Sequence, residues 1–493
     1  MLNASFTVDP SFRVGEVDPR LYGSFVEHMG RCVYTGIYEP GHPSADADGF
    51  RQDTAELVRE LGVPLVRYPG GNFVSGYNWE DGIGPRDLRP SRLDLAWRSV
   101  ETNQVGVQEF MTWAKSVGVE PMMAVNLGTR GIDAARDLVE FCNVRGGTAW
   151  SDKRGGDPYG IKLWCLGNEM DGPWQIGHKT AEEYARLANE TAKAMRQVDP
   201  TIELVACGSS HLNMPTFGSW ENTVLTEAYD AVDYVSMHAY YQQHGDDRDS
   251  FLACAAGMDR FIDAVVSTAD HVRAVGRHKK KINISFDEWN VWYQSRFAGE
   301  KNLDIEQTPR LIEDVYSVTD AVVVGNLLIS LLRHADRVKI ACLAQLVNVI
   351  APIMTEPGGA AWRQASFHPI ALTARFGRGT VLRVEPRSPV HETAEQGEVP
   401  LLDAVAVQGP SGLVVFAVNR SQTSPLTLDV DLRAFTDLSS AKHTALADDD
   451  PDAINTIGAP DRVTPHRRED PKLDGGRLQA VLPPLSWNMI QLS

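Results

Sequence analysis

The chain has 493 residues, of which 43% are hydrophobic and 23% are charged, as is ordinary for a soluble globular protein. This length exceeds one average domain and suits a large barrel with an accessory domain. The formal net charge of −18 argues against a nucleic-acid binder, because phosphate backbones select for clustered Lys and Arg. An acidic chain is compatible with neutral substrates such as sugars.

The six cysteines show no CxxC motif and no close pairing. Cys165, Cys207 and Cys342 lie in apolar runs, where a free thiol behaves as a small hydrophobic side chain. This pattern predicts free thiols in a reducing compartment. The first residues lack the pattern of a secretory signal, and the longest apolar stretch, 321–332, is too short to span a bilayer. We therefore expect a cytoplasmic protein that binds neither membranes nor nucleic acid.

Short apolar runs alternate with amphipathic segments from about residue 20 to residue 375. Such runs, bounded by turn signals, are typical of buried strands. Eight strand–helix repeats predict a (β/α)8 barrel, whose active site lies at the C-terminal ends of its strands. The predicted strands are residues 21–27, 65–68, 121–126, 161–167, 204–208, 234–238, 281–286 and 338–345, and the clearest helices are 53–61, 107–117, 181–198 and 259–275.

The segment 181–198 shows why helices are expected between the strands. Thr180 and Glu183 have the spacing of a capping box, apolar residues then recur at helical spacing, and Pro200 follows the end. One amphipathic helix of this kind would cover each strand of the barrel.

The pattern changes after about residue 375, where short alternating strands replace the helices. Residues 426–432 alternate strictly between apolar and polar side chains, and 486–492 alternate as well. We expect an antiparallel, jelly-roll-like β-sandwich. The predicted domains are an N-terminal segment that pairs with the sandwich, the catalytic barrel and the sandwich itself, at residues 1–18, 19–375 and 376–493. The strands expected in the sandwich are residues 380–384, 402–407, 412–418, 426–432, 479–482 and 486–492.

Two glutamates follow apolar runs at the ends of the fourth and seventh predicted strands. They are Glu169, within Trp164-Cys165-Leu166-Gly167-Asn168-Glu169, and Glu288, within Ser285-Phe286-Asp287-Glu288-Trp289-Asn290. Strand ends of a barrel share one mouth, so the two carboxylates can face each other across one pocket. Glycoside hydrolysis needs such a pair, with one carboxyl group as proton donor and the other as nucleophile or base.

The neighbours of the two glutamates separate their expected roles. Glu169 follows a buried strand and has Trp174 nearby, a setting that raises the pKa of a carboxyl group and suits a general acid. A nucleophile must be ionised and therefore needs hydrogen-bond donors, which Tyr240 can supply to Glu288. Asp287 is a rival for that role, but adjacent strand residues point to opposite faces, so only one of them faces the pocket.

Other polar residues at strand ends have less specific patterns. His28, His211 and His238 could surround a metal, as in metal-dependent barrel hydrolases, but no HxH pair or helical His pair supports this. We predict no metal site and expect these histidines to orient carboxylates. The glycines before Asn72 do not match a nucleotide-binding loop; they are expected to let the backbone turn and bring Asn72 close to a ligand.

The chain resembles the intracellular α-L-arabinofuranosidases of glycoside hydrolase family 51 over essentially its whole length. The resemblance implies a (β/α)8 barrel with a jelly-roll-like sandwich, no cofactor, and a retaining double displacement with Glu169 as acid/base and Glu288 as nucleophile. It also implies an assembly that is commonly a homohexamer. The segments that carry it are 22–28, 67–77, 93–97, 126–129, 164–177 and 285–293.

The resemblance further implies a small pocket for one arabinofuranosyl ring at the non-reducing end of arabinan, arabinoxylan or short oligosaccharides. Ala239, beside His238, stands where a larger polar residue is expected in some relatives, so the resemblance defines the catalytic pair but not the contacts of the outer pocket. The residues implied to bind the sugar or steady the nucleophile are Glu27, Asn72, Asn168, Tyr240 and Gln345, and those implied to wall the ring are Trp97 and Trp292.

Two alternatives remain at this stage. The same barrel chemistry could serve another retaining glycosidase, such as a xylosidase or a β-glycanase, in which case an open cleft is expected. A non-catalytic carbohydrate-binding protein is the second, although it would have no need of both carboxylates. A retaining enzyme predicts carboxyl groups about 5–5.5 Å apart, whereas a separation near 8 Å indicates an inverting one.

Overall fold

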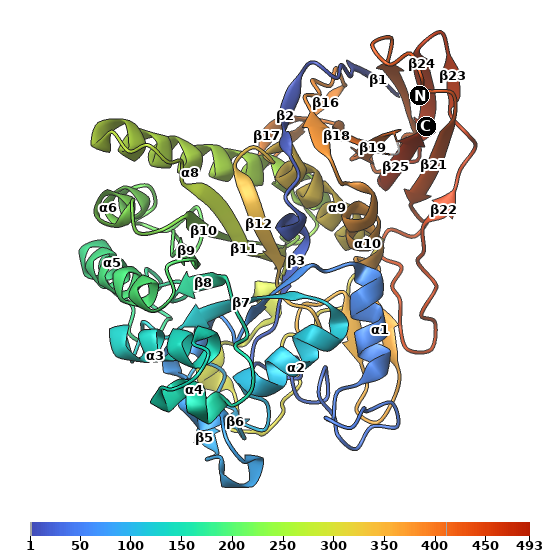
Figure 1. Cartoon of the computed structure of the whole chain (residues 1–493). Helices are drawn as coiled ribbons and strands as arrows, with labels where there is room; N and C mark the ends of the chain where they lie inside the picture. Colours follow the sequence, from blue (N-terminus) through green and yellow to red (C-terminus); the bar gives the residue numbers. More distant parts are fainter. Residues whose placement is uncertain (1, 411) are drawn as a thin grey trace.

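A closed barrel of eight parallel strands forms the centre of the computed structural model, which describes residues 2–410 and 412–493 (Figure 1). Met1, the first residue of the predicted N-terminal segment, lies outside the described residues. The eight predicted runs all become barrel strands, which confirms the predicted fold class. The strands are β3 (Gly23–Phe25), β4 (Leu65–Tyr68), β7 (Glu120–Val125), β8 (Leu163–Leu166), β9 (Glu203–Ala206), β10 (Tyr234–Tyr241), β11 (Asn283–Val291) and β12 (Val338–Leu343).

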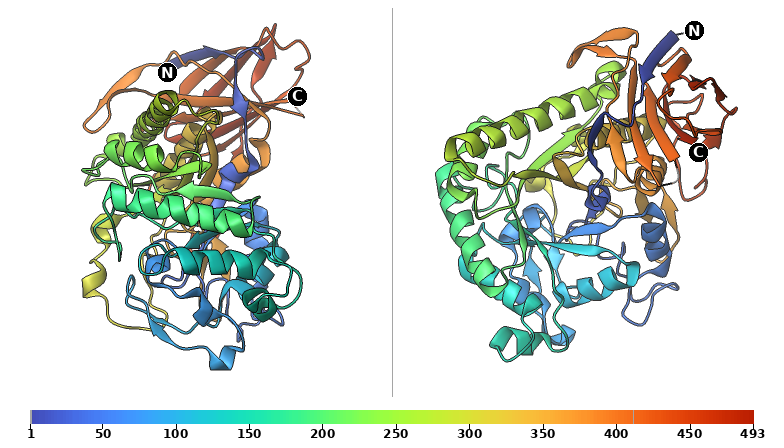
Figure 2. Two further views of the ribbon diagram at one scale, coloured as in Figure 1. Left: turned by 60° about the vertical axis from the view of Figure 1, so that its left-hand side comes forward. Right: turned by 45° about the horizontal axis from the view of Figure 1, so that its top comes forward.

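Helices surround this barrel (Figures 1 and 2). The predicted capping box of α5 (Ala181–Val198) is present, because Thr180 N donates to Glu183 Oε2 at 2.9 Å and Glu183 N donates back to Thr180 Oγ1. No helix among the described residues is both long and apolar enough to cross a membrane. The other helices are α1 (Gln52–Leu61), α2 (Val107–Val117), α3 (Ile132–Asn143), α4 (Ala149–Arg154), α6 (Ser219–Ala228), α7 (Arg248–Leu252), α8 (Cys254–Gly276), α9 (Val318–Arg333) and α10 (Phe367–Phe376).

Strand β11 is longer than its sequence indicates. The predicted strand stops at Phe286, yet β11 continues to Val291, so Asp287 and Glu288 lie within the strand rather than after it. Its polar residues are buried, and they find partners there: Asn290 Nδ2, for example, donates to Ala344 O at 2.7 Å. Pairing with β10 is interrupted by a register shift before His238, which re-aims the side chains at this end of the barrel.

Two further sheets form the C-terminal sandwich. The smaller has the order β1-β20-β24-β23 and the larger the order β2-β15-β18-β19-β25-β21-β22. Most neighbours are antiparallel, as predicted, but β1 pairs with β20 in parallel. The strands are β1 (Leu2–Thr7), β2 (Arg13–Glu16), β15 (Thr380–Leu382), β18 (Leu402–Gly409), β19 (Gly412–Asn419), β20 (Leu426–Asp431), β21 (Ala441–Leu446), β22 (His466–Arg467), β23 (Lys472–Asp474), β24 (Arg477–Leu482) and β25 (Ser486–Leu492).

The core between these sheets follows from the alternation seen in the sequence. Leu426, Leu428 and Val430 of β20 are fully buried, whereas the residues between them face outward. The described residues also form three two-stranded hairpins, of which β16–β17 lies in the C-terminal part. They are β5 (Arg92–Leu93) with β6 (Val100–Glu101), β13 (Ile353–Thr355) with β14 (Ala361–Arg363), and β16 (Val390–Thr393) with β17 (Gly397–Pro400).

Helix α9 lies between the barrel and the sandwich, and every residue from Val318 to Leu332 is buried. This explains why its sequence is apolar on all sides. Asp403 of β18 accepts 2.7 Å hydrogen bonds from Asn326 of α9 and from Arg420. It also forms an ion pair with Arg333 of α9. This cluster of buried charges joins the sandwich to the barrel.

Replacing Asp403 by Ala leaves Arg333 and Arg420 without their shared partner. Removing one member of a buried ion pair costs about 3–5 kcal/mol, so we expect Asp403→Ala to shift the urea unfolding midpoint strongly downward. The matched control is Asp448→Ala, which breaks the surface pair with Arg462 and should cost less than about 1 kcal/mol. Equal shifts for the two variants would contradict a special role for the buried cluster.

Candidate active site

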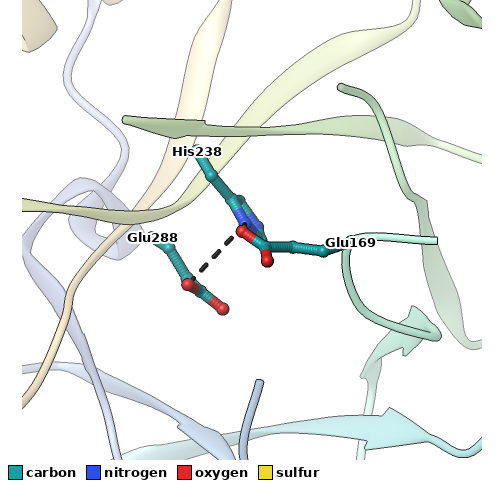
Figure 3. Close-up of side chains that lie close together, drawn as sticks. All are labelled: Glu169, His238 and Glu288. Atoms are coloured by element: carbon teal, nitrogen blue, oxygen red, sulfur yellow. Dashed lines mark hydrogen bonds and ion pairs between the residues drawn. The ribbon is translucent and has the colours of Figure 1, made fainter. Parts of the chain in front are cut away.

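Glu169 and Glu288 meet at the C-terminal end of the barrel, as the sequence predicts (Figure 3). Glu169 follows β8 through a sharp turn in which Gly167 has a φ of 89° and Glu169 itself a φ of 42°. One side-chain ligand atom each from Glu169, Glu288 and His238 lies within 4.8 Å of the others. Such a close approach of the nearest atoms is compatible with the carboxyl separation of about 5–5.5 Å in retaining glycosidases.

Glu288 is held by two hydrogen-bond donors, one on each oxygen. Arg67 Nη1 donates to Oε1 at 2.7 Å, and Tyr240 OH donates to Oε2 at 2.7 Å. The side chain of Glu288 is only 7% exposed, so these donors replace the water that a free carboxylate would bind. The two bonds also fix the rotation of the carboxylate, so that it faces the pocket.

Glu169 has a different environment. Its Oε1 contacts His238 Nδ1 at 2.9 Å, and its Oε2 accepts a 2.7 Å hydrogen bond from the indole of Trp174. Burial raises the pKa of Glu169, and the negative charge of Glu288 raises it further, against the opposing hydrogen bonds. A carboxyl group of raised pKa can hold a proton near neutral pH and give it to a leaving group.

His238 bridges the two strands that carry these carboxylates. Its Nδ1 contacts Glu169, its Nε2 lies 2.9 Å from Asp287 Oδ1, and Glu288 Oε2 is 3.7 Å away. Burial lowers the pKa of His238, but the surrounding carboxylates outweigh this and raise it to about 10. The ring is therefore a buried imidazolium that donates to both Glu169 and Asp287.

Asp287, the rival nucleophile, does not line the pocket. It lies behind Glu288, 2.9 Å from His238 and 3.9 Å from Arg67 Nε. Burial opposes its ionisation, but the two cations outweigh that effect and hold the pKa of Asp287 below its usual range. Asp287 is therefore a buried counter-ion.

A cavity of about 780 Å³ opens in front of the carboxylates. Asn168 is the one residue implied to bind the sugar that does not line this cavity. Its Oδ1 accepts a hydrogen bond from Arg67 Nη2 at 2.7 Å, and its Nδ2 is 3.5 Å from Asn72 Oδ1. Trp292 packs edge-on against the Tyr240 ring with centroids 5.1 Å apart. The implied residues that line the cavity are Glu27, Asn72, Trp97, Tyr240, Trp292 and Gln345.

Glu27, which follows β3, also lines the cavity. Its Oε1 accepts hydrogen bonds from Phe73 N at 2.9 Å and Trp97 Nε1 at 3.0 Å, and Gln345 Nε2 is 3.3 Å from its Oε2. Burial and the charge of Glu288 raise the pKa of Glu27 to about 8. At neutral pH the carboxyl group is protonated and can donate a hydrogen bond to a hydroxyl group.

The loop after β4 passes directly against these carboxylates, and its glycines make this approach possible. A Cβ atom at Gly71 would lie 2.9 Å from Glu288 Oε1 and 3.3 Å from Asn168 Nδ2. A Cβ atom at Gly70 would lie 2.6 Å from Glu27 Cγ. The glycines therefore let the backbone form one wall of the cavity.

The three strand-end histidines do not come together. His28 bridges Glu101 and Tyr68 at 2.8 Å each, and His211 stacks on Trp174. Among the described residues, the one group of three side chains close enough to share a cation is Glu169, His238 and Glu288. Each of them is already engaged by neighbouring protein groups.

Sequence reasoning missed the role of Arg67, which holds both Glu288 and Asn168. The signal was a single cation in the apolar strand Leu65-Val66-Arg67-Tyr68. The sequence also indicated Trp174 only as an apolar neighbour of Glu169, whereas the indole is 44% exposed and donates a hydrogen bond to Glu169. Ala239 lines the cavity, where its small side chain leaves room.

The ionisation of His238 can be measured directly. We expect its ring to stay doubly protonated through neutral pH and to lose its charge only as the pH rises through about 10. The ¹⁵N shifts of the histidine side chains, followed from pH 5 to 11, report this, and His238→Asn identifies the resonance. A midpoint near 6.5, the value of a free histidine, would contradict the charged bridge.

Comparison with known proteins agrees with this geometry. Two family models match, the α-L-arabinofuranosidase 1 domain over residues 57–258 and the α-L-arabinofuranosidase C-terminal domain over 287–486. The chain is 61% identical over 499 residues to an intracellular exo-α-(1→5)-L-arabinofuranosidase of Streptomyces lividans, covering 100% of this chain and 75% of the other. It is 55% identical over 497 residues to one of the same name from Halalkalibacterium halodurans, covering 100% and 99%.

A solved structure gives the same result. The family 51 α-L-arabinofuranosidase of Bifidobacterium longum is 48% identical and superposes with a TM-score of 0.95 over 100% of both chains. Sequence identity at this level over whole chains, together with the shared barrel, leaves one assignment. The chain belongs to the α-L-arabinofuranosidases of glycoside hydrolase family 51.

Proposed function

We propose that this protein is a retaining exo-glycosidase that removes terminal, non-reducing α-L-arabinofuranosyl residues from oligosaccharides and polysaccharides. The observation that carries the proposal is the pair Glu169 and Glu288, brought within 4.8 Å at the base of a cavity. The names of the relatives support the sugar and the exo mode of action.

Glu288 acts as the nucleophile in this proposal. Its carboxylate attacks the anomeric carbon, while Glu169 gives its proton to the glycosidic oxygen and releases the leaving group. The product is an arabinosyl ester of Glu288. Glu169, now ionised, takes a proton from water, which attacks the same carbon. The ester bond to Glu288 breaks, and arabinose of the original configuration is released with the Glu288 carboxylate restored.

The surrounding groups support each role. Arg67 and Tyr240 orient the attacking carboxylate, and the charge of His238 stays next to Glu169 when that residue loses its proton. Asn168, which does not line the cavity, steadies Arg67, and Glu27, with its raised pKa, can donate a hydrogen bond to a sugar hydroxyl group. Such bonds strengthen in the transition state of glycoside hydrolysis. The further substrate-binding residues proposed are Asn72, Trp97, Trp292 and Gln345.

Three further properties belong to the same proposal. We place the protein in the cytoplasm, in line with relatives named as intracellular. We propose a homo-oligomer, with the hexamer implied by the family resemblance. We also propose the division into residues 1–18, 19–375 and 376–493, supported by the pairing of β1 and β2 with sandwich strands and by the end of α10 at Phe376.

A xylosidase or β-glycanase on the same barrel is the alternative, and a carbohydrate-binding protein is a weaker one. The relatives' names favour neither. Purified protein should hydrolyse p-nitrophenyl α-L-arabinofuranoside at least tenfold faster than the α-L-arabinopyranoside or the β-D-xyloside. Arabinose should be the first product from an arabino-oligosaccharide. Failure to cleave the furanoside would refute the proposed function.

Glu169→Ala and Glu288→Ala should separate the two catalytic roles. Glu288→Ala should lose activity on every substrate, whereas Glu169→Ala should retain most of its first step on a dinitrophenyl arabinofuranoside, whose leaving group needs no acid. Azide should rescue both variants differently. It should give an arabinosyl azide of retained configuration with Glu169→Ala and of inverted configuration with Glu288→Ala. Proton NMR distinguishes the products, and the reverse pattern would exchange the roles.

A further inference from the structure

The cavity in front of the catalytic carboxylates is larger than a site for one pentose requires. Pockets of roughly 300–1,000 Å³ enclose drug-sized ligands, and this one has about 780 Å³. Beyond the residues placed around the arabinofuranosyl ring, its lining continues through the segments after β9 and β10 to the start of α8. The cavity therefore has an outer part that the proposed furanose pocket does not account for.

The far wall of this outer part comes from the C-terminal region of the chain. Glu395 and Gln396, in the turn of the β16–β17 hairpin, line the same cavity as Glu169 and Glu288. This hairpin projects from the sandwich alongside α8 (Figure 2). More than one hundred residues of sequence separate its turn from Glu288, so the wall arises only from the tertiary fold.

Several contacts hold the turn in place. Glu395 N donates to Ser250 Oγ at 3.2 Å, and Arg260 donates to the side-chain oxygen of Gln396. The approach to α8 is close, because a Cβ atom at Gly257 would lie 3.1 Å from Gln396 Oε1. The hairpin is thus seated on the barrel at the cavity rim.

The chemistry of the outer part suits neutral sugars. Phe251 and Phe261, each only 2% exposed, are among its apolar lining residues, and polar groups such as Gln242 and Arg260 also line it. At the rim, His244 Nε2 is 3.8 Å from Glu395 Oε1, so an imidazole and a carboxylate face each other. Sugar rings combine apolar C–H faces with hydroxyl groups, and they need this mixture rather than a single charge.

The outer part of the cavity also lies on the side from which the leaving group departs. Glu169 protonates the glycosidic oxygen in the proposed reaction, so the released part of the substrate leaves on its side. In the barrel order β9 is next to β8, which precedes Glu169, and β10 is next to β9. The lining residues Ser210 to Asn213 follow β9, and Ala239 to Gln242 lie at the C-terminal end of β10, so the lining leads from Glu169 towards the hairpin.

We propose that the turn of the β16–β17 hairpin forms the far wall of a leaving-group subsite, which binds the sugar units that follow the scissile bond in an arabino-oligosaccharide. This inference rests on the proposed function and extends it. The C-terminal part of the chain then contributes to the choice of substrate length, with Glu395 and Gln396 as contacts for sugar hydroxyl groups. Ala239 leaves the passage to this subsite open.

The test compares kcat/KM for arabinobiose, arabinotriose and arabinotetraose with that for p-nitrophenyl α-L-arabinofuranoside. In the unmodified protein, kcat/KM should rise from the disaccharide to the tetrasaccharide. A neutral hydrogen bond contributes roughly two- to tenfold, and a hydrogen bond to a charged group contributes more. Gln396→Ala should therefore lower the tetrasaccharide-to-disaccharide ratio by about two- to tenfold, and Glu395→Ala by at least as much. Glu398→Ala, on an exposed position of the same hairpin, is the matched control and should leave the ratio unchanged.

Three results would overturn the inference. A ratio near one in the unmodified protein means that the outer cavity binds no sugar. Equal losses on all substrates, with a lowered unfolding temperature, mean that the hairpin only supports the fold. Absence of cleavage of every arabinofuranoside refutes the proposed function, and the subsite with it. Cleavage of the aryl arabinofuranoside with a ratio near one instead refutes the subsite alone.

Discussion

Three carboxylates share one buried barrel mouth in this protein, and two buried cations make that possible. Charges of one sign in a low-dielectric site must be paired or neutralised. Arg67 lies between Glu288 and Asp287, and His238 lies between Asp287 and Glu169. The chain of alternating charges runs across β4, β11, β10 and the turn after β8, so it also fixes these elements relative to one another.

Because the carboxyl groups share these two cations unequally, their pKa values differ. Asp287 contacts both cations, and its pKa is lowered, whereas Glu169 contacts only His238 and has a raised pKa through burial and the nearby Glu288. Carboxyl groups whose environments drive their pKa values apart can take different chemical roles in one site. Glu27, which has no cation beside it, extends the same logic to the sugar-binding side.

Most of the barrel could be predicted from the sequence, because apolar strands and amphipathic helices are local patterns. Glu169 and Glu288 were found in the same way, as carboxylates after apolar runs. Partners such as Arg67 could not be found in this way, because barrel closure decides which strands face each other. The β16–β17 hairpin was also missed: its short strands are mostly exposed and lack alternation, so only its seat on α8 reveals that it reaches the cavity.

The pairing of β1 with β20 has a consequence for how the chain is made. Strand β1 is synthesised long before its partner, which exists only once residues 426–431 have been made. At about 5–20 residues per second, the N-terminal strand waits on the order of 20–80 s with an unpaired edge. The barrel has a similar delay, because β3 closes against β12. Chaperone binding to the nascent β1 segment is therefore expected to affect the yield of folded protein more than chaperone binding to the helices that follow it.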